Sequence, residues 1–407
     1  IPQGDGTYLI TGTKIFITYG DHDMTDNIVH LVLARLPDAP AGTRGISLFL
    51  VPKFLVNADG SLGARNDAYC IGLEEKLGIH GSPTCVMSYG ENGGAVGTLI
   101  GEENRGLACM FTMMNNARLL VGTQGVAIAE AAYQHALAYA KDRKQGRPLG
   151  SDLAPGEMAP IVEHPDIRRM LLTMKAMTEA SRAICYATAV AIDGAHAGDK
   201  REEAQARADL LTPIAKSFST DAGVETASIG VQIHGGMGFI EETGAAQFLR
   251  DARILPIYEG TNGIQAIDLV TRKLPLGNGD VARAFIAEMR DTAKEARSSN
   301  DKLMSGIGAA LDDALDTLDK ATDYMLANLK SAPNDCLAGA TPYLRLFGTA
   351  AGGHYLTRAA MGNGAAARRE IAQFYAANIL PAVHGLLAPA TAGAESLFAG
   401  DSAVFAD

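Results

Sequence analysis

The first hundred residues carry a pattern of apolar and polar positions that is typical of β-strands. Apolar and polar side chains alternate over Tyr8–Ile17, and Val, Ile, Leu and Phe dominate Ile28–Leu36 and Ile46–Phe54. Clusters of turn-forming residues separate these runs. Several short strands at this spacing predict a compact β domain, either a barrel or a sandwich, over residues 1–100.

Further along the chain, the spacing of apolar residues changes to that of helices. Long helical patterns cover Ala108–Arg143, Pro165–Ala195 and Glu202–Val231, and a last one ends near Lys273. The first pattern ends in basic residues, which suit the negative end of a helix dipole. We therefore expect residues 101–274 to form an antiparallel bundle of four or five helices.

A segment rich in Pro and Gly, Pro275–Asp280, predicts a linker to a further helical region over residues 275–407. Within that region an apolar stripe recurs at helical spacing, and the other faces of the same helix carry several Asp residues. An acidic amphipathic helix would be repelled by an anionic bilayer, so we expect the stripe to pack against protein. The stripe consists of Leu311, Leu315, Leu318, Met325 and Leu329.

Composition narrows the class of protein. The chain has 407 residues, 47% of them hydrophobic, which fits a globular protein of two or three domains. Its net charge of -11 gives no reason to expect a nucleic-acid partner. No apolar run reaches the ~20 residues of a membrane helix, so no membrane insertion is expected. The five cysteines are scattered without a C-x-x-C pair, so neither a disulfide framework nor a metal site is expected.

The segment with the strongest chemical signal is Ile257–Gln265, which reads Ile-Tyr-Glu-Gly-Thr-Asn-Gly-Ile-Gln. By itself, Glu259 in front of a helix indicates only an acidic residue that the helix dipole favours. In combination with other motifs, the chain from about Gly6 to Lys273 resembles the acyl-CoA dehydrogenase family. Six further segments carry this resemblance in the same order along the chain: Lys14–Thr18, Glu75–Thr84, Met113–Arg118, Arg143–Arg147, Glu163–Pro165 and Gln232–Phe239.

The resemblance implies FAD-dependent α,β-dehydrogenation of an acyl-CoA thioester. Glu259 would then be the catalytic base that removes the α-proton, while a hydride passes to flavin N5 and the electrons go on to an electron-transferring flavoprotein. A carboxylate suits this role if it lies within hydrogen-bond reach of the proton in a water-poor site. The flavin supplies the redox chemistry, and the protein supplies position and electrostatics.

The resemblance also implies which residues bind the ligands. Asn115, Arg118 and Gly260 would contact the substrate. This chain departs from the common family motif because no aromatic residue precedes Gly146. Family members complete the flavin site with residues of a neighbouring subunit, so a homodimer or homotetramer is expected. The expected cofactor-binding residues are Phe16, Ile17, Thr18, Arg143, Gln145, His164, Gln232, Ile233, His234, Gly235, Gly236, Thr261 and Gly263.

Three other functions remain open: an acyl-CoA oxidase that uses O₂, a DNA-associated alkylation-response flavoprotein, and a structural subunit with an inactive site. The acidic region after residue 275 argues against the DNA-associated class. That region resembles the C-terminal extension of the bacterial branch that includes methylthiopropionyl-CoA dehydrogenases. The family also has an N-terminal helical domain, which does not precede Ile1, so we expect the natural N-terminus to lie upstream. A bacterial cytoplasmic location is expected.

Overall fold

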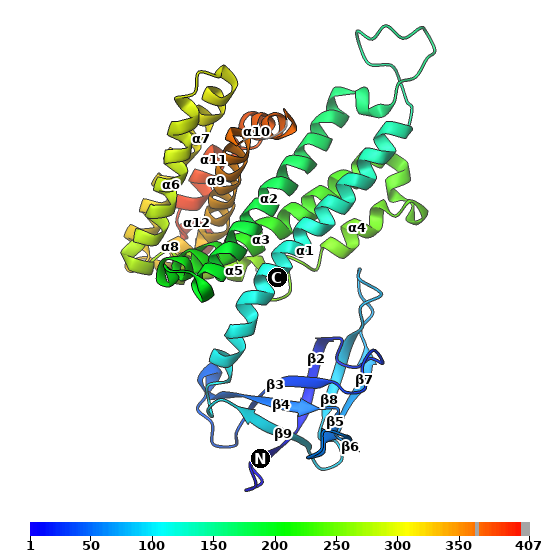
Figure 1. Ribbon diagram of the computed structural model, residues 1–407, viewed down its shortest axis with the longest axis vertical. Coiled ribbons are helices and arrows are strands. Elements are labelled where there is room, and N and C mark those ends of the chain that lie inside the picture. The colour runs from blue at the N-terminus through cyan, green and yellow to red at the C-terminus, as the bar shows by residue number, and fades with distance from the viewer. Residues whose placement is uncertain (363–365, 400–407) are drawn as a thin grey trace. The chain divides into compact units, whose positions relative to one another are not determined.

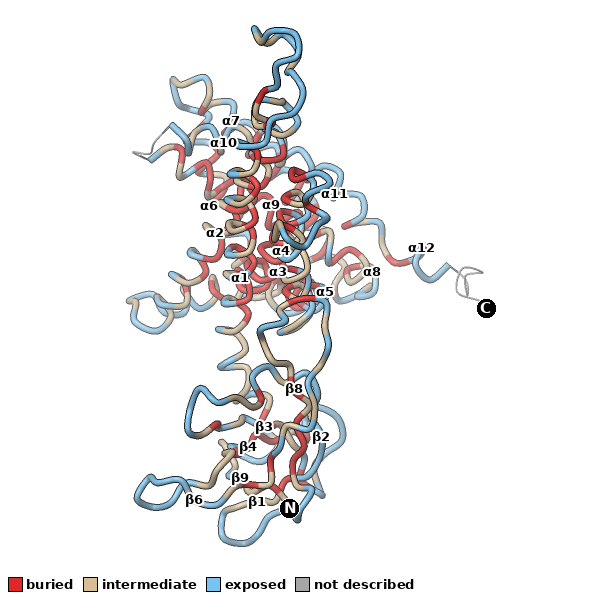
Figure 2. The backbone as a smooth tube through the Cα atoms, turned by 90° about the vertical axis from the view of Figure 1, so that its right-hand side faces the viewer, coloured by how far each residue is buried: buried red, intermediate tan, exposed pale blue. Residues whose placement is uncertain are grey.

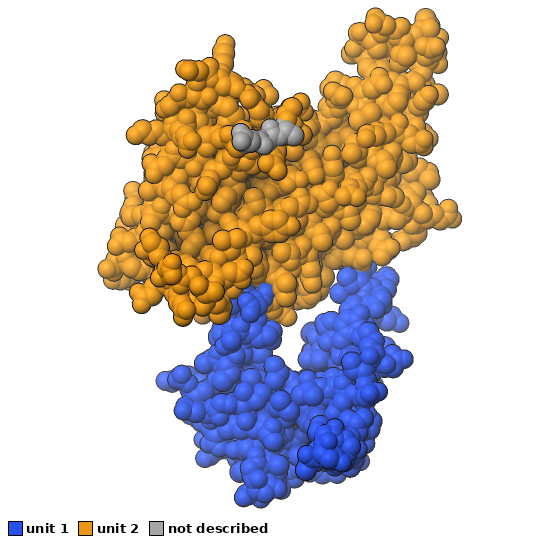
Figure 3. All heavy atoms as spheres, in the orientation of Figure 1, with its two compact units in different colours: residues 1–116 blue, residues 117–407 orange. Residues whose placement is uncertain are grey.

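A computed structural model describes residues 1–362 and 366–399. The chain divides into two compact units, residues 1–116 and 117–407 (Figure 3). Strands occupy the first unit and helices the second, so the predicted order of a β domain, a helical bundle and a further helical region is confirmed. The last eight residues of the predicted third region, 400–407, lie outside the described residues.

The first unit is built of antiparallel sheets (Figure 1). The largest sheet has the order β1 (Thr7–Ile10), β9 (Ala95–Ile100), β4 (Ile46–Pro52) and β3 (Val29–Arg35). The second has the order β2 (Gly12–Thr18), β8 (Thr84–Tyr89) and β7 (Ala68–Leu73). A short hairpin pairs β5 (Phe54–Val56) with β6 (Leu62–Arg65).

Apolar side chains from the two larger sheets form one core. Val32 and Phe49 of the first sheet belong to the same buried cluster as Cys85 and Met87 of the second. Two sheets that share a core in this way correspond to a sandwich. Among residues 1–116 the strands do not close into a barrel, so the sandwich is the correct one of the two predicted forms.

One predicted strand is wrong. The alternating run Tyr8–Ile17 is not a single strand, because β1 pairs with β9 whereas β2 pairs with β8 in the other sheet. The chain changes sheets at Gly12, whose φ of 139° is readily available only to glycine. The stretch Thr11–Lys14 interrupts the apolar residues at this change, so the expected alternation over Tyr8–Ile17 is wrong there as well.

The second unit begins with three long helices. These are α1 (Gly106–Asp142), which starts in the first unit, α2 (Pro165–Ala197) and α3 (Arg201–His234), and their ends fall within three residues of those predicted. Helices α2 and α3 lie side by side (Figure 1). Two shorter helices follow, α4 (Ala245–Ala252) and α5 (Asn262–Asp268), and the latter continues into a π-helical turn, Leu269–Lys273.

The C-terminal region packs on this bundle. The predicted stripe is buried: Leu311, Leu315, Leu318 and Met325 expose no surface and share one core with residues of α2 and α3 (Figure 2). The region therefore covers its apolar surface with the helical domain of its own chain. Its helices are α6 (Asp280–Arg297), α7 (Lys302–Asn328), α8 (Pro333–Ala338), α9 (Ala340–Met361), α10 (Ala366–Asn378), α11 (Ala382–Thr391) and α12 (Glu395–Phe398).

In the described ranges, no individual helix combines the length and apolar character needed to cross a membrane. The pair α10 and α11, bent by 47°, meets that requirement jointly, on length and composition alone. Both helices contribute buried side chains to the shared core, among them Tyr375 and Val383.

Candidate active site

The predicted base, Glu259, lies in the loop between α4 and α5, and a backbone hydrogen bond joins the two ends of this part of the loop. The Asn262 amide donates to the Pro256 carbonyl over 2.9 Å. Between these residues, Glu259 and Gly260 both have left-handed backbone, with φ of 54° and 84°. This conformation costs a non-glycine residue roughly 1–2 kcal/mol, and residues held in it cluster at functional sites. The Glu259 side chain is exposed.

The residues that follow Glu259 fix the shape of this turn. A Cβ atom on Gly260 would lie 2.8 Å from Gln265 Nε2, so both space and backbone conformation favour glycine there. Thr261 caps α5, because its hydroxyl accepts a hydrogen bond from the Ile264 amide at 3.2 Å. Gly263 is exposed in the first turn of the same helix.

A buried polar group supports the loop from α3. Lys216 exposes no surface, and its ammonium donates to Asn262 Oδ1 over 2.9 Å. Burial lowers the pKa of Lys216 to about 8; the charges of Asp221 and Glu259 oppose this shift, and that of Arg118 adds to it. The loop therefore lies close to a buried cation.

The two predicted substrate-binding residues of α1 differ in their surroundings. Arg118 is 5% exposed, and its Nη1 lies 3.3 Å from Asp268 Oδ2. Asp268 also pairs with Arg272, whose Nε lies 2.6 Å away. The guanidinium of Arg118 is thus held in an internal ion pair close to Gly260, 3.9 Å from the position of a Cβ atom there. Asn115 is half-buried.

Most of the predicted cofactor-binding residues of the second unit line one groove, with a volume of about 770 Å³. It forms where the loop after α1, the start of α2 and the end of α3 meet. His164 bonds through Nε2 to the Gln145 carbonyl at 2.8 Å, which ties two of these segments together. The groove brings together the predicted residues Arg143, Gln145, His164, Gln232, Ile233, His234, Gly235 and Gly236.

His234 is the most buried polar side chain of this groove, at 4% exposure. Its ring stacks between those of His135 and Tyr139, with centroids 4.8 Å and 4.3 Å away. Its Nδ1 donates to the Gly230 carbonyl at 2.7 Å, and burial lowers its pKa. The ring is therefore neutral at pH 7 and leaves Nε2 as an acceptor, which has no hydrogen-bond partner among the described residues.

The predicted flavin-edge residues lie in β2 of the first unit. The register between β2 and β8 shifts between Lys14 and Ile17, and Phe16 within this bulge has φ of 60° and 66% of its surface exposed. A bulge of this kind redirects a side chain away from the regular pleat. Ile17 is half-buried and Thr18 is exposed.

Several supporting residues were not predicted from the sequence. Lys216 and Asn262 support the Glu259 loop, whereas His135 and Tyr139 enclose His234. A lysine inside the apolar stretch of α3 around Leu210–Phe218 is a usable signal, because lysine is almost never fully buried unless paired. His135 and Tyr139 fit an ordinary helical pattern and give no such signal.

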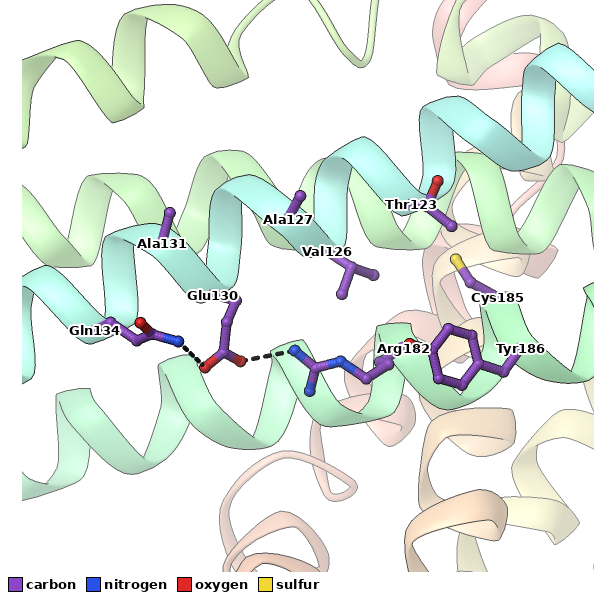
Figure 4. A pocket seen from close by; sticks show the side chains of 9 residues that line it. All are labelled: Thr123, Val126, Ala127, Glu130, Ala131, Gln134, Arg182, Cys185 and Tyr186. Atoms are coloured by element: carbon purple, nitrogen blue, oxygen red, sulfur yellow. Dashed lines mark hydrogen bonds and ion pairs between the residues drawn. The ribbon is translucent and has the colours of Figure 1, made fainter.

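A second hollow, of about 420 Å³, lies between α1 and α2 and contains none of the predicted residues. Its charged groups bond to one another: Glu130 accepts from Gln134 at 3.0 Å and from Arg182 at 2.7 Å (Figure 4). Lys175 lies 3.4 Å from the same carboxylate. These groups have their partners within the protein, so the hollow offers little chemistry compared with the groove.

Comparison with known proteins gives the same family as the sequence motifs. Residues 104–274 match the acyl-CoA dehydrogenase C-terminal domain, and residues 285–401 match the domain described as acetyl-CoA dehydrogenase C-terminal like. The chain is 52% identical over 375 residues to 3-methylmercaptopropionyl-CoA dehydrogenase of Ruegeria pomeroyi, which covers 92% of this chain and 62% of that relative. It therefore spans less than two thirds of that relative's length.

Solved structures show the same fold at lower identity. Caenorhabditis elegans ACDH-11 in complex with C11-CoA superimposes with a TM-score of 0.76 at 24% identity, over 92% of this chain and 60% of the other. A Bacillus anthracis acyl-CoA dehydrogenase complexed with FAD gives 0.74 at 19% identity, over 99% and 66%. Together with the domain matches, these similarities show that the chain belongs to the acyl-CoA dehydrogenase family.

Proposed function

We propose that the protein is an FAD-dependent acyl-CoA dehydrogenase in which Glu259 is the base. The observation that carries this proposal is the Glu259–Gly260 turn, which holds the carboxylate of the motif on left-handed backbone. Membership of the acyl-CoA dehydrogenase family supports the reaction class.

The groove at the end of α3 fits an anionic dinucleotide. Arg143 supplies a positive charge for a pyrophosphate, and Gly235 and Gly236 have no atom within 4 Å of a Cβ position, so a ligand can approach their backbone closely. His234 Nε2 is a buried acceptor that a ribose hydroxyl or an adenine amine would satisfy. When bound, FAD would serve as the hydride acceptor.

The residues of this chain have separate tasks in the reaction. Glu259 takes the α-proton of the thioester, which is only weakly acidic, so its removal needs a base that is held in position. Arg118 and Asp268 form an ion pair that joins α1 to α5, the helix that follows the loop. Arg143, Gln145 and the Gln232–Gly236 segment bind the cofactor, and oligomerisation with a second copy completes its site.

For the substrate we propose a short acyl-CoA that carries a thioether. The support is the 52% identity to the Ruegeria pomeroyi enzyme, whose name specifies 3-methylmercaptopropionyl-CoA. The electrons would pass to an electron-transferring flavoprotein rather than to O₂.

A bleaching screen tests this function. Full-length protein loaded with FAD is mixed anaerobically with acyl-CoAs of different chain length, branching and thioether content, and the flavin absorbance is followed. We expect bleaching, fastest with 3-methylmercaptopropionyl-CoA, and slow recovery of absorbance on admission of air. Fast recovery would identify an oxidase, and absence of bleaching with every thioester would reject the dehydrogenase.

A further inference from the structure

A fully buried lysine lies beneath the loop that carries Glu259. Lys216 exposes no surface, and no carboxylate among the described residues forms a salt bridge with its ammonium. An ammonium has three donors, and its transfer out of water is unfavourable unless it is paired. Burial of a lysine without a carboxylate partner therefore costs the fold stability, which points to a role other than stabilisation.

Asn262 transmits the position of Lys216 to the loop. Its side-chain oxygen accepts from Lys216 at 2.9 Å, and its side-chain nitrogen donates to Thr220 and Asp221 at 3.0 and 2.7 Å. Its backbone amide donates to the Pro256 carbonyl and closes the loop around Glu259. One amide side chain thus holds the left-handed turn against a single face of α3.

The charges around Lys216 come from three elements. Asp221 lies on the same helix and accepts from Asn262, Arg118 lies on α1, and Glu259 lies in the loop itself. Arg118 is already paired with Asp268. Among the described residues, the Lys216 ammonium donates its hydrogen bond to Asn262, so this contact links the lysine to the loop.

We infer that Lys216 is a positioning residue for Glu259: its ammonium holds the Asn262 side chain, and Asn262 closes the turn that carries Glu259. This inference rests on the proposed function, because it takes Glu259 to be the base. Buried charges are replaced by apolar groups without loss of stability in many proteins, so a structural role alone does not account for this lysine.

Lys216→Met in the full-length, FAD-loaded protein tests the inference. We expect kcat to fall by roughly 10- to 100-fold, the scale of a slightly misplaced catalytic group, with little change in KM. Lys216 does not line the cofactor groove, so the variant should retain FAD. The melting temperature should not fall, because an unsatisfied charge is also removed.

Three further variants test the link. Asn262→Ala keeps the lysine but removes the amide that it holds, so kcat should fall by a similar factor. Lys216→Gln keeps a donor, so it should recover part of kcat relative to Lys216→Met. Thr212→Val alters a buried α3 hydroxyl that bonds to its own helix at Ala208, and it should change neither kcat nor KM. Asn262→Ala and Lys216→Gln also serve if Lys216→Met does not fold.

The wild type and Glu259→Gln are measured first, which keeps the two proposals apart. A wild type that desaturates no acyl-CoA, or an active Glu259→Gln, rejects the proposed function. If both behave as expected, Lys216→Met with kcat within about twofold of the wild type overturns the positioning role. Loss of kcat together with loss of FAD or a fall in melting temperature, and no recovery of kcat in Lys216→Gln, shows a structural role only and overturns it as well.

Discussion

Glu259 and Phe16 have the same unusual backbone, with φ of 54° and 60°. A side chain with a Cβ atom avoids this region, and a bulky one is a clear outlier there. Both residues belong to segments that resemble motifs of the family: Glu259 is the proposed base, and Phe16 is a predicted flavin-edge residue. Strained backbone at these two positions supports the proposal that the surrounding structure holds each side chain in place for function.

The strain at Glu259 is measurable. Glu259→Gly should raise the free energy of unfolding by about 1 kcal/mol relative to Glu259→Ala, because only glycine enters the left-handed region without steric cost. The alanine variant is the matched control, since both changes remove the carboxylate. Urea unfolding of the two proteins measures the difference, and equal stabilities would show that the turn is not strained.

Residues that belong to a short local motif can be predicted as candidate site residues from the sequence. Glu259, Arg143 and His234 belong to such segments, and the groove brings the last two together. Lys216 contacts Asn262, and His135 contacts His234. Both contacts join residues that are distant in the sequence, and no local pattern specifies them.

At the scale of elements, the groove at the end of α3 depends on a short basic loop after α1. Arg143 lines the groove, whereas Arg147 in the same loop does not. Arg143→Ala should weaken FAD binding by roughly 10- to 100-fold, because it removes a charge-assisted contact to phosphate. Arg147→Ala is the matched control and should have little effect. Flavin fluorescence titration of the apoprotein distinguishes them, and equal losses would count against the assignment.

Helices α3, α6 and α9 meet at Glu288. Its carboxylate lies near His354 and forms an ion pair with Arg207 at 2.7 Å, and these partners lower the pKa of Glu288 from 4.5 to about 2. The folded state thus holds the charged form more firmly than the unfolded chain does. The resulting stabilisation is present above about pH 4.5 and disappears as the pH falls toward about 2.

Acid unfolding tests this contact. The wild type should lose melting temperature between about pH 4.5 and pH 2 more steeply than Glu288→Gln, which has no carboxylate to protonate. The side chain is 39% exposed, so solvent screens the effect and the difference should be modest. Parallel profiles would show that Glu288 does not link the three helices.

For helices and strands, the pattern of apolar residues predicts some features and not others. The ends of α1, α2 and α3 followed from helical spacing because each helix is long and strongly periodic. The change of sheets at Gly12 did not, because the partners of β1 and β2 are strands far along the chain, which a local pattern does not specify.

At the scale of the whole molecule, the C-terminal helices and the bundle share one core. Leu315 of α7 belongs to the same buried cluster as Leu210 and Phe218 of α3. The apolar stripe predicted that α7 would be covered by protein, but it did not specify by which surface. Only the three-dimensional packing shows that the covering surface belongs to this chain.

A shared core predicts unfolding in one step. Leu315→Ala should destabilise the entire helical unit by about 2–5 kcal/mol, as expected for a leucine that leaves a buried cavity. Leu397→Ala, at a leucine that is 61% exposed, is the matched control and should change stability by less than ~0.5 kcal/mol. Circular dichroism and calorimetry follow the transition. A separate transition that alone responds to Leu315→Ala would show that the C-terminal region is an independent module.

The role of Glu259 as the base is tested by stopped-flow mixing of the full-length, FAD-loaded wild type and Glu259→Gln with the best acyl-CoA from the screen, without oxygen. The amide keeps the shape of the side chain and removes its basicity. We predict that Glu259→Gln retains FAD but bleaches about 10²- to 10⁴-fold more slowly than the wild type. Bleaching at the wild-type rate would contradict the assignment and show that another group removes the proton.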